Sequence, residues 1–309
     1  MKTKNKLSWC LFLSFALLLF QVGNRASAST SNFTFGIVGD SEKFNPDISN
    51  GPLQKAVKKI STAKSKFIVS MGDMSTSCGG DDVCKTRFTS FKDILKSKFS
   101  KYYLTMGDND RTDTSADDIW QEVFSLPGNS PSSSYDETVY SFNYGNSHFV
   151  FLNSQNPDDH DVDSDQRTWL EEDLNNNTRE NVFVFFHEPA WPTNSKVGKS
   201  LDKNPSERDE LWNILSDYKV TAVFSGHEHL YTRKKITVDL LPGVKNEVYQ
   251  FIVGNTNAST SAKVPKKGMS DYYYTKNSYV LVDVKGKKIT VRAYKTNGKL
   301  LNKFDFVGK

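Results

Sequence analysis

Strand-like and helix-like patterns alternate through the first third of the chain. β-Branched and aromatic side chains are concentrated at residues 33–39, 66–71 and 101–106, which predicts three strands. Between them, apolar residues recur every three to four positions at 52–63 and again at 86–98, which predicts two amphipathic helices. This order of strand, helix, strand, helix and strand is typical of an α/β sheet.

The pattern changes in the second half of the chain. Alternating residues at 138–154 predict a hairpin, and a helix is expected at 166–174 with Ser164 or Asp165 as its cap. A further helix is predicted at 206–217, and further strands are predicted at 182–186, 220–225, 231–239, 247–253, 278–284, 288–295 and 303–307. Because no repeat or long linker divides the chain, we expect an α/β fold in which two packed mixed sheets are flanked by helices.

The N-terminus has the features of a secretory signal peptide. Three lysines precede an apolar run at 7–22, and Ala26-Ser27-Ala28 follows it. A membrane anchor is the alternative, but 16 residues fall short of the roughly 20 that a spanning helix needs. We therefore expect cleavage after Ala28, no membrane anchor afterwards, and a secreted or otherwise extracytoplasmic product. Residues 29–309 are predicted to form a single domain with a β-rich C-terminal part.

Removal of that segment changes the charge of the chain. The whole sequence has 40 basic and 36 acidic residues, and residues 1–28 hold four of the basic ones and no acid. The mature chain is therefore neutral, which gives no sign of non-specific affinity for nucleic acid or membranes. Cys78 and Cys84 remain, and in an exported protein they are expected to form a disulfide. Two zinc-binding thiolates are the alternative, although no second pair completes such a site.

Several predicted strands end at a residue that binds metals well, in most cases directly after a glycine. Ligands gather at the carboxyl ends of strands in α/β sheets, so we expect these side chains to meet. Isolated Gly-Asp pairs are common turn chemistry, but a series of them followed by two histidine-ended strands is not explained by turns alone. The candidate metal ligands are Asp40, Asp73, Asp108, His187, His227 and His229.

Three carboxylates and three imidazoles suit transition metals that accept mixed nitrogen and oxygen ligands. Six ligands exceed the needs of one tetrahedral site, so two ions are the expected number. Iron, zinc and manganese all fit this donor set. A carboxylate that bridges the ions would hold them at the spacing used by two-metal phosphoesterases, where a metal-bridging hydroxide attacks phosphorus.

The order of these motifs resembles the calcineurin-like metallophosphoesterase superfamily. The motifs are Gly-Asp at 39–40 and 72–73, GDND at 107–110, FFHEP at 185–189 and GHEH at 226–229. The stretches SFNYGNSHFVFLNS (141–154) and SGHEHLYTR (225–233) are most similar to the purple-acid-phosphatase-like branch. The resemblance implies a four-layer α/β/β/α sandwich. It also implies that Asp40 and His229 hold the first metal, that Asp73 bridges both, and that the second metal is held by Asp108, His187 and His227.

The third motif departs from the pattern of the family, which has Gly-Asn-His followed by an acid. Asp108 then replaces an amide ligand, and Asn109 stands where the family has a catalytic histidine. An asparagine can bind a phosphoryl oxygen but cannot supply a proton, a contribution typically worth about 10²–10⁴ in rate. In an alternative alignment, Asn109 is the ligand and Asp110 is the acid or lies in the outer shell. The metal-binding tyrosine of the purple enzymes is replaced by Thr76.

Of four other polar residues, three allow two interpretations. Glu42, two residues after the first aspartate, either ligates the first metal or is solvated. His148 is expected to be structural. His160 lies in an acidic loop and is expected to be solvated, although it could instead fold over the metals and supply the missing proton. Arg111 is expected on the surface, with contact to substrate phosphate as the alternative.

These observations together predict an exported phosphoesterase with two metal ions that hydrolyses phosphomonoesters. A phosphodiesterase with the same site is the first alternative. The second is a secreted binding protein on a degenerate phosphoesterase scaffold, and Asn109 is the feature that keeps it open. The expected partner is a small molecule or another substrate that carries a phosphate ester, and the sequence does not identify its organic part.

Overall fold

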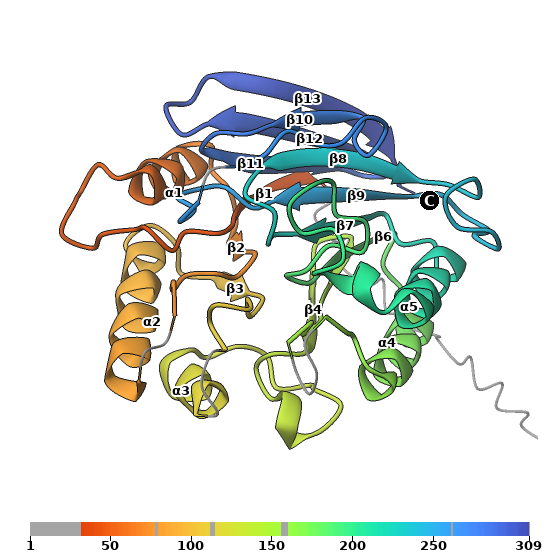
Figure 1. Cartoon of the computed structure of the whole chain (residues 1–309), viewed down its shortest axis with the longest axis horizontal. Coiled ribbons are helices and arrows are strands. Elements are labelled where there is room, and N and C mark those ends of the chain that lie inside the picture. The colour runs from red at the N-terminus through yellow and green to blue at the C-terminus, as the bar shows by residue number, and fades with distance from the viewer. Residues whose placement is uncertain (1–31, 78–79, 112–114, 156–159, 261, 309) are drawn as a thin grey trace, which may run out of the picture.

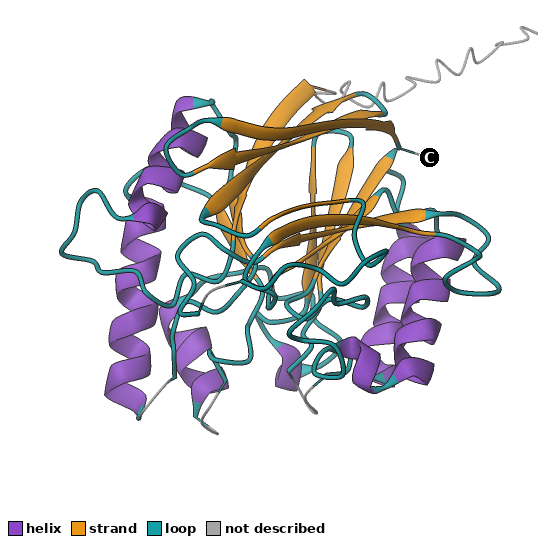
Figure 2. Ribbon diagram, turned by 45° about the horizontal axis from the view of Figure 1, so that its top comes forward, coloured by secondary structure: helices purple, strands orange, loops and turns teal. Residues whose placement is uncertain are grey.

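A computed structural model describes residues 32–77, 80–111, 115–155, 160–260 and 262–308. Two β-sheets pack face to face, and helices cover both outer sides (Figure 1; Figure 2). This four-layer arrangement confirms the predicted fold class. The signal peptide and Cys78 fall outside the described residues, so the predicted leader and the predicted disulfide remain predictions. Within the described part of the chain, no helix is long and apolar enough to span a membrane.

The first sheet has six strands in the order β13-β12-β11-β1-β2-β3. Its three N-terminal strands are parallel, and the C-terminal strands add to β1 in antiparallel fashion. The bounds are β1 (Asn32–Val38), β2 (Ile68–Ser70), β3 (Tyr102–Leu104), β11 (Ser278–Lys285), β12 (Lys288–Lys295) and β13 (Leu300–Val307). Three helices lie along its outer side: α1 (Pro52–Thr62), α2 (Asp81–Lys96) and α3 (Ala116–Val123).

The second sheet has seven strands in the order β10-β8-β9-β7-β6-β5-β4. A parallel centre of β5, β6, β7 and β9 is flanked by antiparallel strands. The bounds are β4 (Tyr140–Tyr144), β5 (Ser147–Phe151), β6 (Asn181–Phe185), β7 (Ala222–Ser225), β8 (Tyr231–Ile236), β9 (Val248–Val253) and β10 (Tyr272–Tyr274). Its outer side is covered by α4 (Ser164–Asn176) and α5 (Pro205–Asp217), and two short 3₁₀ turns lie at Ser133–Tyr135 and Leu201–Lys203.

The strand β6 shows how the sequence builds both inner layers. All five of its residues are buried, as expected for a central parallel strand with both faces covered. Phe183 and Phe185 point into the aromatic core between the sheets, where Phe35 of β1 lies 5.5 Å from Phe183 between ring centroids. Val182 and Val184 point the other way and pack with the residues under α4 and α5. Each large side chain buried in this way contributes about 1.5–3 kcal/mol.

Four details differ from the predictions. The helix α2 begins at Asp81 rather than at residue 86, and α3 and β10 lie in segments where we expected no element. The cap of α4 is Asp163, whose carboxylate accepts a hydrogen bond from the Gln166 amide, so the predicted caps Ser164 and Asp165 are wrong. An aspartate can cap from any position whose backbone is extended, and the sequence did not show which of the neighbouring acids would have that conformation.

Candidate metal centre

The loops after β1, β2, β3, β6 and β7 meet at one edge of the two sheets. They bring together two groups of side chains whose potential ligand atoms lie within 4.8 Å of one another in each group. The first group is Asp40, Glu42, Asp73 and His229, and the second is Asp108, His187 and His227. All six predicted ligands therefore lie in one of two adjacent groups, with Glu42 added to the first. The assignment of each side chain to a metal remains a prediction.

Three of these residues hold a strained backbone conformation. Asp40 has a φ of 47°, Asp73 of 52° and His227 of 67°, in the left-handed region that side chains other than glycine rarely adopt. Such a conformation costs on the order of 1–3 kcal/mol and persists only where its surroundings fix it. At Asp40 the fixing contact comes from the other sheet, because the His227 backbone amide donates to its carboxylate at 3.0 Å.

The glycines before the ligands are needed for close approach. A Cβ atom on Gly107 would lie 2.2 Å from the Asp73 carboxylate oxygen, and one on Gly226 would lie 2.7 Å from that of Asp40. Neither glycine has a positive φ. At these two positions, therefore, glycine makes room for a neighbouring carboxylate, and the left-handed backbone conformation occurs at Asp40, Asp73 and His227 themselves.

The second group is organised around one oxygen of Asp108. His187 Nε2 lies 3.0 Å from Asp108 Oδ1, and His227 Nδ1 lies 2.9 Å from the same atom. The outer nitrogen of each ring is engaged by a backbone carbonyl: His187 Nδ1 donates to Met71 O at 2.5 Å, and His227 Nε2 donates to Lys199 O at 2.7 Å. These bonds orient the rings so that each inner nitrogen faces Asp108, where the neutral ring would offer its lone pair to a metal, and metal-ligating histidines are usually held by such an outer hydrogen bond.

The first group has the same design. His229 Nδ1 lies 2.7 Å from Thr260 Oγ1, so its Nε2 faces inward, 3.3 Å from Glu42 Oε1 and 3.6 Å from Asp40 Oδ1. Glu42 is 3% exposed and accepts hydrogen bonds from the amide and hydroxyl of Ser259. Of the two alternatives for Glu42, solvation is therefore wrong, because the loop after β9 folds over this carboxylate.

Asp73 lies between the two groups. Its Oδ1 atom is 3.5 Å from His187 Nε2, although the carboxylate belongs to the first group. Asn109 donates to both of its oxygens, from the backbone at 3.0 Å and from the side-chain amide at 2.8 Å. In this arrangement Asp108, rather than Asn109, lies beside His187 and His227, which favours the first alignment for the ligand.

Asp110 lies outside the two ligand groups and supports them, as one part of the alternative alignment predicts. It is fully buried, and its two oxygens accept four backbone N–H groups, those of Asp73, Met74, Ser75 and Gly107, at 2.8–3.1 Å. This carboxylate therefore ties the loop after β2 to the loop after β3. The acid at the end of GDND was its only signal in the sequence, and the number of its donors could not be foreseen.

The charges of the site explain why it suits cations. Burial raises the pKa of Asp40 well above its usual value, that of Asp73 to about 7 and that of Asp110 to about 8, with nearby carboxylates adding to the effect. Burial alone would also raise the pKa of Asp108 and lower that of His187. Their mutual contact, the hydrogen bond of Asp108 with His227 and the charges of Asp73 and Asp40 beside His187 reverse both shifts. A buried cluster so rich in carboxyl groups lacks positive charge, and the mixed donors fit transition-metal ions.

Two residues that the sequence did not single out border the second group. Lys196 Nζ lies 3.7 Å from Asp108 Oδ2. Glu228, between the two histidines of GHEH, is buried and accepts hydrogen bonds from Thr193 N, Thr193 Oγ1 and Asn194 N at 2.6–2.7 Å. Glu228 therefore holds the loop that carries Lys196 against the site. In the sequence, the position of Glu228 between the two histidines of GHEH was the signal that could have identified it.

The two remaining histidines have well-defined partners. His160 Nδ1 lies 2.7 Å from a carboxylate oxygen of the buried Glu188, whose other oxygen is 3.9 Å from His227 Nε2. The expectation of a solvated His160 is therefore wrong, whereas its role as a proton donor remains a prediction. His148 lies in β5 between Asn143 and Asp173, which confirms a structural role.

Arg111 is not a free surface side chain. Its Nε atom lies 3.2 Å from both carboxylate oxygens of Asp117 in α3, and Nη1 donates to the Gln155 carbonyl. The guanidinium thus connects the loop after β3 with the loop after β5.

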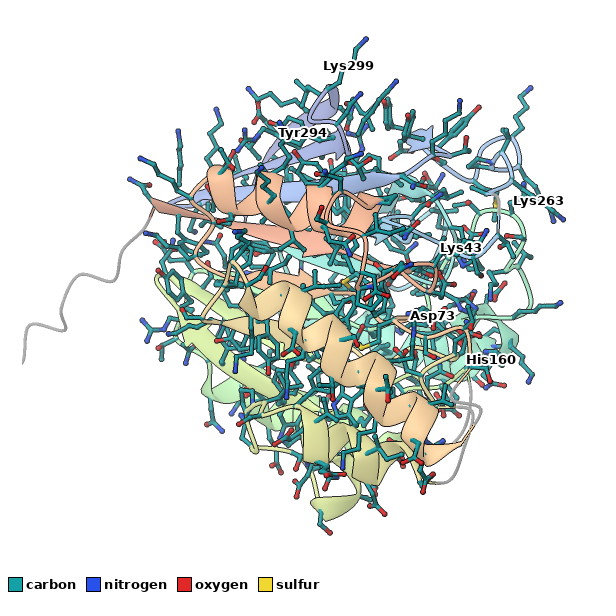
Figure 3. The ribbon with its side chains drawn as sticks, turned by 90° about the vertical axis from the view of Figure 1, so that its left-hand side faces the viewer. Lys43, Asp73, His160, Lys263, Tyr294 and Lys299 are labelled. Atoms are coloured by element: carbon teal, nitrogen blue, oxygen red, sulfur yellow. The ribbon has the colours of Figure 1, made fainter. Side chains whose placement is uncertain are left out.

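In Figure 3, Asp73 lies between Lys43 and His160 near the same side of the molecule.

The comparisons with known proteins decide the family. A family model described as calcineurin-like phosphoesterase matches residues 33–231. The chain belongs to the calcineurin-like phosphoesterase family. The match begins at the strand that leads to Asp40 and extends past His229, so it includes both groups of candidate ligands. The resemblance that the motifs indicated is thereby confirmed at the level of the family.

Its curated relatives include plant purple acid phosphatases. The chain is 34% identical to purple acid phosphatase 13 of Arabidopsis thaliana over 110 residues, which are 36% of this chain and 20% of that protein. It is 36% identical to purple acid phosphatase 22 of the same plant over 99 residues, 31% of this chain and 22% of that protein. The calcineurin-like chain thus matches only about a fifth of the length of these relatives.

Solved structures share the fold at low sequence identity. The purple acid phosphatase PPD1 of yellow lupin has a TM-score of 0.73 at 16% identity and covers 91% of this chain and 54% of its own. PhoD has a TM-score of 0.70 at 14% identity, with 91% of this chain and 71% of its own covered. GAP50, described as the anchor in the inner membrane complex of Plasmodium, has a TM-score of 0.64 at 14% identity over 91% of this chain and 90% of its own.

Proposed function

We propose that this chain is a dinuclear-metal phosphoesterase that hydrolyses phosphomonoesters. The observation that carries the proposal is the pair of adjacent ligand groups, in which three histidines each turn a fixed inner nitrogen toward carboxylates. Asp40 and His229 would hold one ion with Glu42, the second would be held by Asp108, His187 and His227, and Asp73 would bridge both. Iron, zinc or manganese ions bound there would activate water and neutralise the charge of the phosphoryl group.

The residues around the metals have separate tasks in this proposal. The Asn109 amide, 2.8 Å from an Asp73 oxygen, is placed to bind a phosphoryl oxygen but has no proton to supply. The Lys196 ammonium, close to Asp108, is placed to bind the same dianion by charge. Asp110 and Glu228 keep the loops that carry these groups in position.

Two other functions use the same site differently. A phosphodiesterase would share every ligand and differ in the loops around the entrance. Asn109 is the residue that favours a binding protein on a degenerate scaffold. GAP50, which is described as an anchor, has a similar fold. Against it, a protein without metal chemistry has no physical need for seven buried or half-buried ligands that converge in two groups.

Export belongs to the proposal as well. The basic start, the apolar run at 7–22 and the Ala26-Ser27-Ala28 sequence support a cleaved leader and a secreted or extracytoplasmic enzyme. N-terminal sequencing of the secreted protein tests this, and we expect a new N-terminus at Ser29.

The first experiment is to measure metal content per chain by elemental mass spectrometry on residues 29–309 purified without chelators. We expect close to two transition-metal ions, and fewer in His227→Ala, with hydrolysis of 4-nitrophenyl phosphate faster than that of bis(4-nitrophenyl) phosphate. No bound metal after incubation with manganese or zinc would overturn the proposal and favour the binding protein. A faster reaction with the diester would favour the phosphodiesterase.

A further inference from the structure

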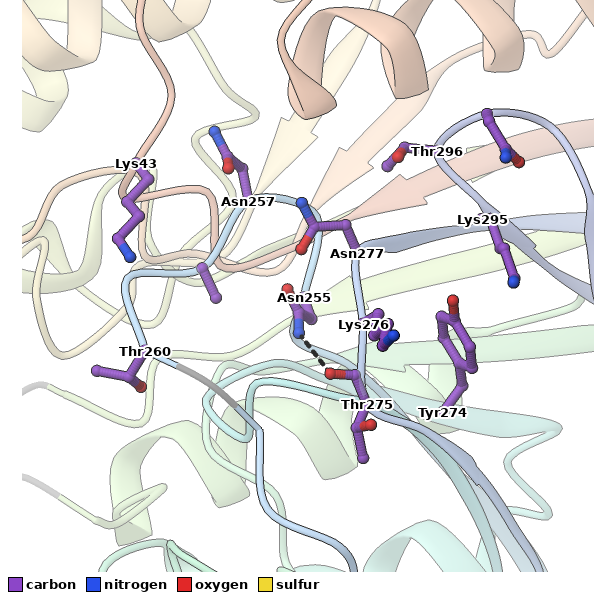
Figure 4. A pocket seen from close by; sticks show the side chains of 12 residues that line it. Lys43, Asn255, Asn257, Thr260, Tyr274, Thr275, Lys276, Asn277, Lys295 and Thr296 are labelled. Atoms are coloured by element: carbon purple, nitrogen blue, oxygen red, sulfur yellow. Dashed lines mark hydrogen bonds between the residues drawn. The ribbon is translucent and has the colours of Figure 1, made fainter.

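A pocket of about 580 Å³ lies beside the first ligand group. Figure 4 shows its polar lining: Lys43 and Thr260 stand at one end, Tyr274 and Lys295 at the other, and asparagine side chains lie between them. The walls come from the loops after β1 and β9 and from the segments around β10 and the end of β12. No candidate metal ligand lines this pocket, but Thr260, a hydrogen-bond partner of His229, does.

The ring of His229 lies between the pocket and the metal centre. His229 turns Nε2 toward Asp40 and Glu42, and its Nδ1 atom lies 2.7 Å from Thr260 Oγ1 on the pocket rim. The backbone makes a second connection, because Asn257 N donates to the carbonyl of Asp40 at 3.1 Å. The pocket and the metal centre are therefore neighbours that share the loops after β1 and β9.

The pocket has an excess of positive charge. Lys43, Lys276 and Lys295 line it, and no acidic residue does. Among the residues that the structure describes, none of these three ammonium groups forms an ion pair. Like charges in a concave site repel each other but raise the local concentration of anions. Asparagine and threonine side chains add hydrogen-bond donors, so the chemistry of the lining matches a phosphate or a carboxylate.

We infer that this pocket binds a second anionic group on the substrate, so that the preferred esters carry a phosphate or carboxylate on their leaving group. The inference rests on the proposed hydrolase, since the reacting phosphate would sit at the metal centre and the leaving group would extend past His229. Three lysines with no acidic residue among the lining would stabilise an anionic group, whereas a neutral alcohol would gain nothing from their charge.

Binding without turnover tests the pocket directly. Butane-1,4-bisphosphonate and butylphosphonate are compared by isothermal titration calorimetry at constant ionic strength, with chelator-treated and with metal-loaded protein. We expect tighter binding of the bisphosphonate to both. Each of Lys43→Gln, Lys276→Gln and Lys295→Gln should weaken it by about two- to fivefold, and the triple variant by about tenfold or more. The control is Lys299→Gln, an exposed lysine that does not line the pocket (Figure 3).

Turnover then tests the link to catalysis. 1,4-Butanediol bisphosphate and butyl phosphate have nearly the same leaving alcohol, so the second phosphate is the main difference between them. We expect a kcat/KM ratio about tenfold or more in favour of the bisphosphate, reduced toward the statistical factor of about two in the triple variant. The triple variant should keep its rate on butyl phosphate and its metal content.

The two proposals fail in different ways. No preference for the bisphosphonate, or an equal loss in Lys299→Gln, overturns the pocket inference even if butyl phosphate is hydrolysed. A lysine-dependent preference in a protein that binds no metal and hydrolyses no ester overturns the hydrolase and leaves an anion-binding pocket.

Discussion

Replacement of Lys196 separates its two opposite effects on the site. Its ammonium lies 3.7 Å from Asp108 Oδ2, where it attracts a phosphoryl dianion and repels a metal ion on the same carboxylate. At about 4 Å and an effective dielectric constant near 20, two unit charges interact by about 4 kcal/mol. The side chain is 26% exposed, so we reduce this to about 1.5–3 kcal/mol. Lys196→Gln is therefore expected to lower kcat/KM by about 10- to 100-fold.

The same substitution should leave metal affinity unchanged or increase it, because a competing cation is removed from Asp108. The assay pairs initial rates on 4-nitrophenyl phosphate with a competition titration against a chromogenic zinc chelator. Lys199→Gln is the matched control, since that exposed side chain lies in the same loop. An unchanged kcat/KM in Lys196→Gln, or a fall in kcat/KM that metal loss fully accounts for, would refute the reasoning.

Four further outcomes are expected. Asp110→Asn should lower the free energy of unfolding by denaturant by about 2–4 kcal/mol, since an NH₂ group replaces one of the two oxygens that accept the four N–H groups. A loss below about 1 kcal/mol would contradict the role of Asp110 in joining the two loops. Glu228→Gln should lower kcat/KM by about tenfold through the loop of Lys196, and its effect should largely vanish in a Lys196→Gln background; additive losses in this double-mutant cycle would show that Glu228 acts otherwise. Chelator-treated protein should become less stable as the pH rises from about 4 to about 8. The raised pKa values of Asp73 (about 7) and Asp110 (about 8) make the folded chain hold protons that the unfolded chain releases. A Tm that stays constant or rises over this range would contradict the prediction. If His160 supplies a proton, His160→Ala should slow alkyl phosphates more than 4-nitrophenyl phosphate, and an unchanged ratio of the two rates removes that role.

The parts of the site that follow from local sequence were predictable. Each candidate ligand lies within four residues of the end of a strand whose apolar pattern is clear, so the convergence of Asp40, Asp73 and His227 needed only the rule that strand ends meet. The core was predictable for the same reason, because the unbroken apolar run of a central strand such as β6 is evident from its sequence.

The supporting contacts were not predictable, because they join segments far apart in the chain. Glu42 is covered by Ser259, and Glu228 accepts from Thr193, and neither pairing leaves a periodic signal. His160 looked solvated because its own loop is acidic, while its partner Glu188 comes from the loop after β6. The left-handed conformations of the ligands depend in the same way on contacts between loops.

The hydrogen bond from His227 to Asp40 has a consequence for assembly. It joins the loop after β7 in one sheet to the loop after β1 in the other, and each ligand group takes residues from both sheets. A folding intermediate with only one sheet in place would therefore offer fragments of a centre and no complete one. Metal affinity should then appear late in folding, together with the docking of the sheets. Ions bound in the folded protein would stabilise the two sheets against separation.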